Sequence, residues 1–283
     1  MKIMVTGANG QLGQELVVQL KNTAYQLYAF TKQELDITNI QQVSEVVNEI
    51  QPDVIINAAA YTNVDGAETN KDLAFNVNAY GQRNLAIAAE KIGAKICYVS
   101  TDYVFNGTAN SPYNEYAQVE PLGIYGESKY AGEFLTNTLS SKYFIVRTAW
   151  VYGEYGPNFV KTMLRLAEEK DELGVVHDQV GSPTYTVDLA EFILQLIETE
   201  KYGIYHCTNS GTCSWYEFAK AIFELAGKEI KVNPLNSDQF PRPAKRPNYS
   251  VLSDMAISVN GFGARRHWKE ALNEYINKNN NLL

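Results

Sequence analysis

Residues 3–13 read Ile3-Met4-Val5-Thr6-Gly7-Ala8-Asn9-Gly10-Gln11-Leu12-Gly13 and place a glycine-rich turn between an apolar strand and a helix. The glycines have the spacing G-x-x-G-x-x-G, a variant of the dinucleotide-binding fingerprint. Without side chains at these positions the backbone can approach a pyrophosphate, and the first amides of the helix offer a partial positive charge. In this strand–turn–helix context the motif predicts a nucleotide site; the alternative is an ordinary tight turn.

The first half of the chain alternates short apolar runs with amphipathic stretches. Strands are expected at 3–6, 26–30, 54–57, 95–100 and 144–148. Helices are expected from Leu12 and over 40–50, 73–92 and 125–139. This alternation predicts βαβ units and a parallel sheet, and nearly continuous apolar strands suit a sheet covered on both faces. The predicted fold class is α/β, with a Rossmann-like doubly wound parallel sheet.

The alternation loosens beyond about residue 150, which predicts a division of the chain. Residues 1–150 are expected to form the dinucleotide-binding domain, and 151–283 a smaller α/β region that mainly binds substrate. Within this region, 187–207 is expected to return to the first sheet. Four of the nine prolines lie in 234–247, which predicts an ordered loop or lid, and the Asn-rich run 277–281 predicts a frayed end.

Composition limits the classes of function. The chain has 283 residues, of which 45% are hydrophobic and 20% charged, as in an ordinary globular protein. A net charge of −8 argues against a nucleic-acid partner, which needs clustered Lys and Arg. The three cysteines lack metal-ligand spacing and suit free thiols. With no signal peptide and no membrane span expected, the sequence predicts a cytoplasmic protein.

Tyr125 and Lys129 form a Tyr-x-x-x-Lys pair on the predicted 125–139 helix, downstream of a hydroxyl side chain, Thr101, at a strand end. Positions i and i+4 share one helix face, so both side chains can meet the same substrate and cofactor. Free tyrosine has a pKa near about 10 and exchanges protons poorly at neutral pH. A neighbouring ammonium is expected to lower the pKa of Tyr125.

The same pentapeptide pattern occurs twice more, at Tyr28…Lys32 and Tyr216…Lys220. The first lies in a predicted strand, where positions i and i+4 are far apart. The second is expected on a helix far from the nucleotide motif. Position relative to Thr101 and to the glycine turn therefore favours Tyr125 and Lys129 as the catalytic pair.

The end of the second predicted strand bears on the type of cofactor. A carboxylate there would bind the adenine ribose and favour NAD, but the chain reads Phe30-Thr31-Lys32. A hydroxyl and an ammonium suit a 2′-phosphate, so NADPH is expected, with NADH also accepted; the alternative is that both side chains simply face solvent. Asp36 and Ile37 are expected to flank the adenine.

Several segments together carry a family resemblance: Ser100-Thr101-Asp102-Tyr103-Val104-Phe105, Asn57-Ala58-Ala59-Ala60-Tyr61-Thr62-Asn63-Val64-Asp65, Arg147-Thr148-Ala149-Trp150-Val151-Tyr152-Gly153, Asp178-Gln179-Val180-Gly181-Ser182-Pro183-Thr184 and Arg246-Pro247-Asn248-Tyr249-Ser250. With the glycine turn and the Tyr125…Lys129 pair, they resemble the extended short-chain dehydrogenase/reductase family. Within it they look like the dTDP-4-dehydrorhamnose reductase branch, which completes dTDP-L-rhamnose synthesis.

The resemblance implies a reaction and a role for each matching residue. NADPH would reduce the C4 ketone of dTDP-4-dehydro-β-L-rhamnose, and Tyr125 would protonate the resulting alkoxide. Lys129 would lower the Tyr125 pKa and hold the nicotinamide ribose, and Thr101 would bind the substrate oxygen. The expected substrate contacts are Thr101, Asp102, Tyr103, Trp150, Asn158 and Arg246. The expected cofactor contacts are Gly7, Gly10, Gln11, Leu12, Gly13, Thr31, Lys32, Asp36, Ile37, Ala58, Ala59, Ala60, Tyr61, Thr62, Asn78 and Lys129, with an N-cap role as the alternative for Asn78.

Tyr103 separates reaction types within the superfamily. Sugar-nucleotide dehydratases place an acid directly after the Thr-Asp pair, and this chain has a tyrosine there. A dTDP- or UDP-sugar epimerase, a related dTDP-4-keto-6-deoxysugar reductase and a non-catalytic nucleotide-binding subunit are the remaining alternatives. No metal ligands are predicted, participation of an ion such as Mg²⁺ is left open, and the chain is expected to be a monomer or homodimer.

Overall fold

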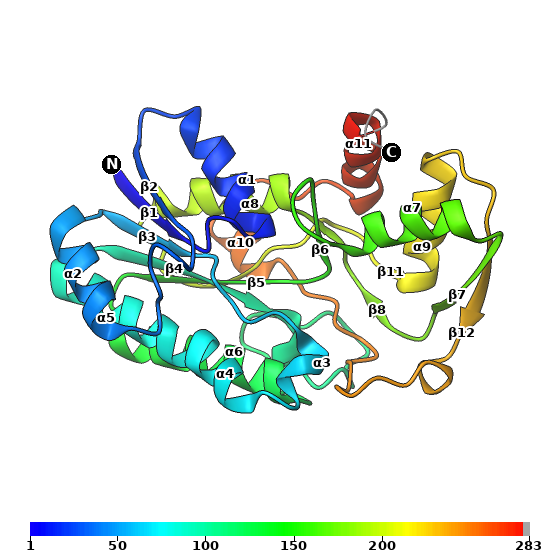
Figure 1. Cartoon of the computed structure of the whole chain (residues 1–283), viewed down its shortest axis with the longest axis horizontal. Helices are drawn as coiled ribbons and strands as arrows, with labels where there is room; N and C mark the ends of the chain where they lie inside the picture. Colours follow the sequence, from blue (N-terminus) through cyan, green and yellow to red (C-terminus); the bar gives the residue numbers. More distant parts are fainter. Residues whose placement is uncertain (280–283) are drawn as a thin grey trace.

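A single parallel sheet organises the computed structural model, which describes residues 1–279 (Figure 1). Its six strands are β1 (Lys2–Thr6), β2 (Gln26–Phe30), β3 (Val54–Asn57), β4 (Lys95–Thr101), β5 (Tyr143–Thr148) and β10 (Gly203–His206). They lie in the order β10-β5-β4-β3-β1-β2, and every neighbouring pair is parallel. The predicted α/β class with a parallel sheet is therefore confirmed.

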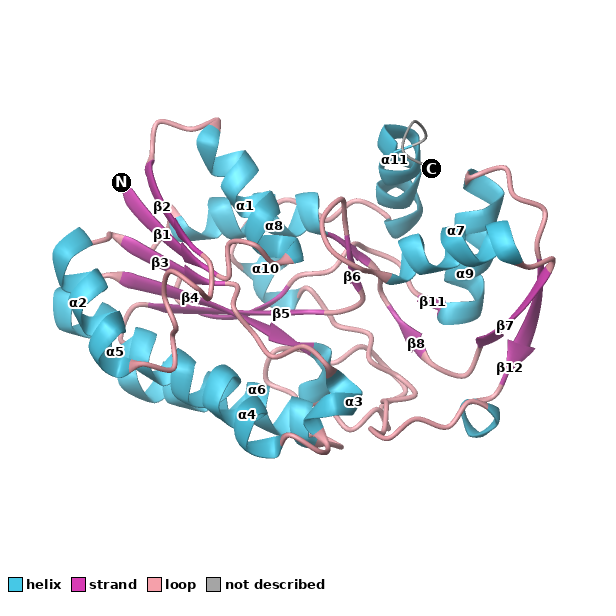
Figure 2. Ribbon diagram, viewed as in Figure 1, coloured by secondary structure: helices cyan, strands magenta, loops and turns pink. Residues whose placement is uncertain are grey.

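Helices cover both faces of this sheet (Figure 2). One face carries α1 (Gln11–Lys21), α8 (Thr186–Ile197) and α10 (Met255–Val259), and the other carries α2 (Ile40–Ile50), α5 (Gln82–Ile92) and α6 (Ile124–Leu139). Successive strand residues point to opposite faces. Ile3 and Val5 accordingly share a buried cluster with Leu16 of α1, whereas Met4 lies in the cluster of Val43 and Leu85.

The strand order reverses at β1, which has β2 on one side and β3 on the other. The connections that follow these strands therefore leave in different directions. In open parallel α/β sheets, ligands bind in the crevice at the carboxyl ends of the strands at such a reversal. The topology places a binding crevice beyond Thr6 and Asn57.

The predicted helix over 73–92 is wrong as one regular helix. The segment consists of α4 (Lys71–Phe75), the π-helical η1 (Asn76–Gly81) and α5. Wider π-helical turns free backbone groups from the regular ladder. Here the carbonyl of Asn78 accepts a hydrogen bond of 2.8 Å from the Tyr98 hydroxyl on β4, so a tertiary contact stabilises the irregular turn.

The C-terminal half adds a second apolar core. Its helices are α7 (Phe159–Glu169), α9 (Trp215–Leu225) and α11 (Trp268–Asn279), beside the short strand pairs β6 (Val151–Tyr152) with β9 (Thr184–Tyr185), β8 (Val180–Gly181) with β11 (Cys213–Ser214), and β7 (Glu172–Val176) with β12 (Lys231–Leu235). The core lies between these helices and strands and includes Phe218 and Trp268, which are 0% and 2% exposed. Figure 1 shows this half beside the carboxyl edge of the central sheet.

Two local expectations for this half are wrong. The loop expected over 234–247 begins later, because Pro234 lies inside β12, where a two-stranded edge tolerates the missing N–H. The frayed end expected from residue 277 is helical through Asn279, and residues 280 and 281 lie outside the described part. Within residues 1–279 no helix has both the length and the apolar character to cross a membrane.

Gly13 tests the packing of the glycine turn. A Cβ at Gly13 would lie 2.0 Å from the Gly7 carbonyl oxygen, so Gly13→Ala must separate α1 from the turn. We expect the free energy of unfolding in urea to fall by about 1–3 kcal/mol, as for overpacked sites. Val18→Ala, at a 42% exposed position of the same helix, is the control and should change it by less than about 0.5 kcal/mol. Equal stability of both variants would contradict the packing argument.

Candidate active site

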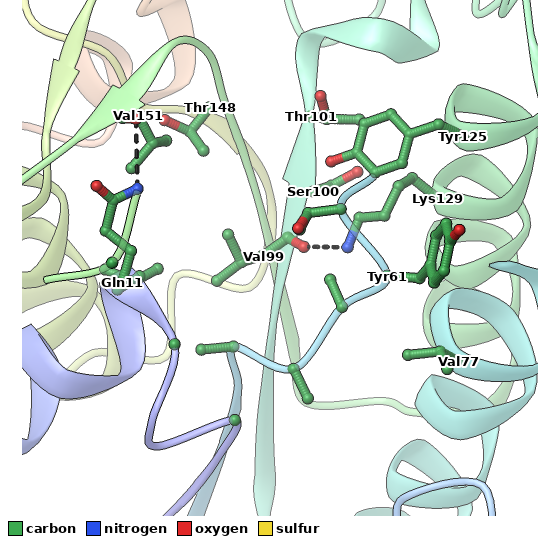
Figure 3. A pocket seen from close by; sticks show the side chains of 18 of the residues that line it. Gln11, Tyr61, Val77, Val99, Ser100, Thr101, Tyr125, Lys129, Thr148 and Val151 are labelled. Atoms are coloured by element: carbon green, nitrogen blue, oxygen red, sulfur yellow. Dashed lines mark hydrogen bonds between the residues drawn. The ribbon is translucent and has the colours of Figure 1, made fainter. Parts of the chain in front are cut away.

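A cavity of about 740 Å³ opens at the carboxyl ends of β1, β3, β4 and β5. Glycines and alanines of the turns after β1 and β3 line one part of it, and Thr101, Tyr125 and Lys129 line another (Figure 3). The volume suits a ligand of cofactor size. The structure thus brings the glycine turn and the Tyr-Lys pair, which are far apart in the sequence, to one cavity.

The glycine turn leaves room for a phosphate group. Gly7 has φ 70°, and a Cβ there would lie 2.5 Å from the Ala59 backbone nitrogen. Gly10, the N-cap of α1, provides no side-chain cap, so the first amides of the helix remain for another acceptor. This combination of a side-chain-free surface and helix amides fits a dinucleotide pyrophosphate.

A buried polar chain fixes the two turns relative to each other. The Thr6 hydroxyl donates to Asn57 Oδ1 at 2.7 Å, and the Ala59 N–H donates to the same oxygen at 3.0 Å. Asn57 Nδ2 donates to Gln82 on α5 at 2.7 Å. Because buried hydrogen-bonded amides hold one geometry, this chain positions both turns that line the cavity.

Only some of the cofactor contacts predicted in the connection after β2 lie at the cavity. Lys32, Asp36 and Ile37 line the cavity, so an ammonium is available at the position expected for an adenosine 2′-phosphate. Thr31 does not line the cavity, because its hydroxyl and its N–H both donate to Glu34 Oε2 at 2.8 Å. The expected hydroxyl contact from Thr31 is therefore corrected to a local turn contact.

Tyr125 and Lys129 lie in the first two turns of α6, on the face that meets β4 (Figure 3). Lys129 is 2% exposed; its ammonium donates to the Val99 carbonyl at 2.6 Å and lies 4.0 Å from the centre of the Tyr98 ring. Burial lowers the pKa of Lys129 to about 7, although the charge of Glu133 opposes this.

The expected lowering of the Tyr125 pKa is wrong for this structure. Desolvation raises the pKa of Tyr125 to about 12, with a smaller opposite effect from the Thr101 hydroxyl. The Lys129 ammonium is directed to the backbone of β4 instead of to the phenol oxygen (Figure 3). Tyr125 therefore carries its proton at neutral pH.

Thr101 and Asp102 form the wall beside Tyr125. Thr101 Oγ1 donates to Asp102 Oδ1 at 3.0 Å and accepts from the Tyr103 N–H at 3.2 Å. Asp102 is 2% exposed, and its Oδ2 has no hydrogen-bond partner among the described residues. Burial raises the pKa of Asp102 to about 6, and smaller opposite effects come from hydrogen bonds of the Ser250 and Thr101 side chains.

Trp150 forms an aromatic wall of the cavity in a strained backbone conformation. Its φ of 48° is in the left-handed region, which few non-glycine residues adopt. The indole stacks on Trp215 with ring centres 3.6 Å apart, and Gly181 leaves it room, since a Cβ there would lie 2.7 Å from the ring. Trp215, which sequence reasoning did not select, thus sets the position of this wall.

The remaining predicted residues do not line the cavity but hold elements around it. Asn158 caps α7 and donates to Gln11 at 3.1 Å, and Asn78, inside η1 and not at a helix start, bonds both backbone groups of Tyr61. The N-cap alternative for Asn78 is therefore wrong. Gly13 packs α1 on the turn.

Arg246 lies in a neighbouring hollow of about 450 Å³ with Arg242 and Lys245. Its guanidinium binds both carboxylate oxygens of Asp65 at 3.0 Å. This ion pair joins the 234–247 segment to α3 (Val64–Ala67), on the first half of the chain. The hollow is lined by these three cationic side chains and by the carboxylate of Asp238.

Sequence reasoning missed several lining residues at the ends of strands and in the connections after them. They include Val77, Val99, Ser100, Thr148, Val151, Gly156 and Pro157. Their position in the sequence was the available signal. Val99 and Ser100 lie near the end of β4, and Thr148 ends β5. Ligands of α/β proteins bind at this carboxyl edge of the sheet. Among residues 1–279 there is no group of three or more His, Cys, Asp or Glu side chains arranged to hold a metal ion.

Comparison with known proteins places this site in a family. The model of the RmlD substrate binding domain matches residues 1–281. The chain belongs to this family. It is 47% identical to the spore coat polysaccharide biosynthesis protein SpsK of Bacillus subtilis strain 168, over 97% of this chain and 96% of the relative. It is 46% identical to a dTDP-4-dehydrorhamnose reductase of Aggregatibacter actinomycetemcomitans, over 96% and 97% of the two chains.

A solved relative extends the comparison to three dimensions. The crystal structure of dTDP-4-dehydrorhamnose reductase from Bacillus anthracis strain Ames in complex with NADP is 50% identical to this chain. The two structures superpose with a TM-score of 0.96 over 98% of this chain and 99% of the other. The resemblance expected from the sequence is confirmed.

Asp102 makes a testable contribution to stability. The pKa of Asp102 is about 6 in the folded chain, against about 3.9 in the unfolded chain. Between these pH values the folded state binds a proton that the unfolded state has lost. The stability that this proton contributes is therefore lost as the pH rises through 6. Asp102→Asn lacks this effect. In urea unfolding, the stability of Asp102→Asn relative to wild type should be about 1 kcal/mol more favourable at pH 8 than at pH 5. A pH-independent difference would contradict the raised pKa.

Proposed function

We propose that this protein reduces the C4 ketone of dTDP-4-dehydro-β-L-rhamnose with NADPH, giving dTDP-L-rhamnose. The observation that carries the proposal is the convergence of Thr101, Tyr125 and Lys129 with the glycine turn in one cavity. Membership of the RmlD substrate binding domain family, and relatives called dTDP-4-dehydrorhamnose reductase, support it.

The residues present fit NADPH. The Gly7–Gly10 turn and the first amides of α1 would hold the pyrophosphate, Lys32 the 2′-phosphate, and Lys129 the nicotinamide ribose. When bound, the reduced nicotinamide would supply the hydride. NADH is expected to be accepted more weakly, because Lys32 would then lack its phosphate partner.

Tyr125 is the proton donor in this mechanism. Its raised pKa, about 12, means that the phenol keeps its proton until the ketone oxygen becomes an alkoxide, a stronger base. The Thr101 hydroxyl would donate to the same substrate oxygen after leaving Asp102. The nearby Lys129 ammonium would stabilise the phenolate that remains.

The C-terminal region, 151–283, would bind most of the substrate, and 1–150 the cofactor. Tyr103 and Trp150, which line the cavity from the first region, would add aromatic walls for the sugar. Arg246 would bind the diphosphate in exchange for Asp65, a carboxylate with the same two-oxygen geometry. A cytoplasmic location and a monomeric or homodimeric state remain predictions from the sequence.

The direct test is oxidation of NADPH, followed at 340 nm, with enzymatically generated dTDP-4-dehydro-β-L-rhamnose. We expect oxidation proportional to enzyme, with dTDP-L-rhamnose as the product by mass spectrometry and chromatography. No oxidation at any enzyme concentration would reject this reductase. Oxidation only with a different dTDP-4-keto-6-deoxysugar would retain the chemistry and reassign the substrate.

Tyr125→Phe tests the proton donor. Removing the hydroxyl should lower kcat by at least about 100-fold, the usual contribution of general acid catalysis, while the fluorescence-measured Kd for NADPH stays within about twofold. Tyr130→Phe, at a 39% exposed position of α6, is the matched control and should keep wild-type kcat. Undiminished turnover in Tyr125→Phe would show that another group supplies the proton.

A further inference from the structure

A buried ion pair lies behind the catalytic lysine. Glu133 and Arg147 have side chains only 3% and 2% exposed. Arg147 Nε donates to Glu133 Oε1 at 2.9 Å and Nη2 to Oε2 at 2.6 Å, so the pair is bidentate. The Ser100 hydroxyl, whose residue lines the cavity, donates to Glu133 Oε1 at 2.5 Å. Replacing such a pair with apolar residues is often neutral or stabilising, so burial alone does not explain its presence.

The carboxylate is placed one helical turn behind Lys129. Tyr125, Lys129 and Glu133 occupy positions i, i+4 and i+8 of α6 and therefore share one face. Arg147 on β5 pairs in register with Ser100 on β4, so two strands and one helix meet at the carboxylate. Its oxygens cannot move without breaking bonds to both strands.

We propose that Glu133 is a positioning residue for Lys129: its fixed carboxylate keeps the lysine protonated and directed to the floor of the cavity. The inference rests on the proposed role of Lys129. Lys129 is buried where a neutral amine would be favoured, and Glu133 is the one group that opposes this among the causes of its shifted pKa. Arg147 is held by Glu133 and by neutral partners, the Glu115 carbonyl and His206, whose pKa burial lowers to about 3.

The other ionisable groups around Lys129 do not replace Glu133. Groups that line the cavity with Lys129 or lie on elements packed against α6 include Tyr98 from β4, Tyr125 from α6, Asp102 and Tyr103 from η2 (Asp102–Val104), Tyr61 after β3 and Arg147 from β5. On the packed helices η1 and α5, Tyr80 is 54% exposed and Glu90 binds Ser141, so both point elsewhere. Desolvation raises the pKa values of Tyr98 and Tyr125, which keeps both neutral, and Asp102 bonds Thr101.

The test compares Glu133→Gln with the double variant Glu133→Gln/Arg147→Met, which removes both charges of the ion pair and so guards against misfolding of the single variant. Lysines labelled with ¹³C at Cε are titrated by NMR, and Lys129 is assigned by the signal lost in Lys129→Met. We expect the Lys129 midpoint to fall by about one pH unit in the single variant. In the double variant we expect a smaller fall, because loss of the Arg147 charge favours the ammonium. Glu127→Gln, which removes the other carboxylate of α6, should leave it unchanged.

The second measurement is the alkaline limb of the pH profile of kcat/KM for the proposed reduction. Because the proposed activity requires the ammonium, this limb should move to lower pH in each folded variant that carries Glu133→Gln. The shift should equal the shift of the Lys129 midpoint in the same variant. An unchanged Lys129 midpoint in a folded variant would overturn the inference and assign the pair a purely structural role. The NMR titration needs no substrate, so a shifted midpoint in a protein without reductase activity would reject the proposed function and retain this inference.

Discussion

The close approach of the turn after β1 to the turn after β3 is the constraint on which the site depends. At Gly7 even a methyl group would overlap the backbone of Ala59, and at Gly13 it would overlap Gly7 itself. The strand order reverses at this point, so the chain leaves the two turns in opposite directions and a crevice remains above the sheet. Glycine at both positions lets the backbone, instead of side chains, form the wall that faces a ligand.

Buried polar groups transmit this geometry to the rest of the cavity. Asn57 links the two turns to α5 through Gln82, which in turn donates to Thr136 of α6 at 2.8 Å. On the same helix, Glu133 binds Ser100 and Arg147 at the ends of β4 and β5. Two short chains of hydrogen bonds therefore relate α6 to β1, β3, β4 and β5. Such networks restrict geometry more than they add stability, because each buried group first loses its hydration.

Local patterns in the sequence account for the fold and for the core of the site, whereas contacts between distant residues account for most errors. The spacing of Tyr125 and Lys129 determines that they share a helix face, and the glycine turn needs only its neighbouring strand and helix. By contrast, Asp65 lies 181 positions before its partner Arg246, so no pattern around either residue reveals the pair. The π-helical turn at Asn78 depends on the Tyr98 hydroxyl from another strand. Thr31 is different, since its partner Glu34 is only three residues away and a local reading could have found it.

The pKa values along one face of α6 show why tyrosine and lysine can share a buried site. Burial alone favours neutral forms: it raises the pKa of Tyr125 to about 12 and lowers that of Lys129 to about 7. In the proposed reduction a neutral phenol donates the proton, so for Tyr125 burial and the proposed chemistry agree. For Lys129 they conflict, because only the ammonium would stabilise the phenolate that the proposed reaction leaves. Glu133 lies one turn further along the helix, and Arg147 and Ser100 hold its carboxylate in place. We infer that this carboxylate favours the charged form of Lys129, whose ammonium hydrogen-bonds to the Val99 carbonyl and not to Glu133.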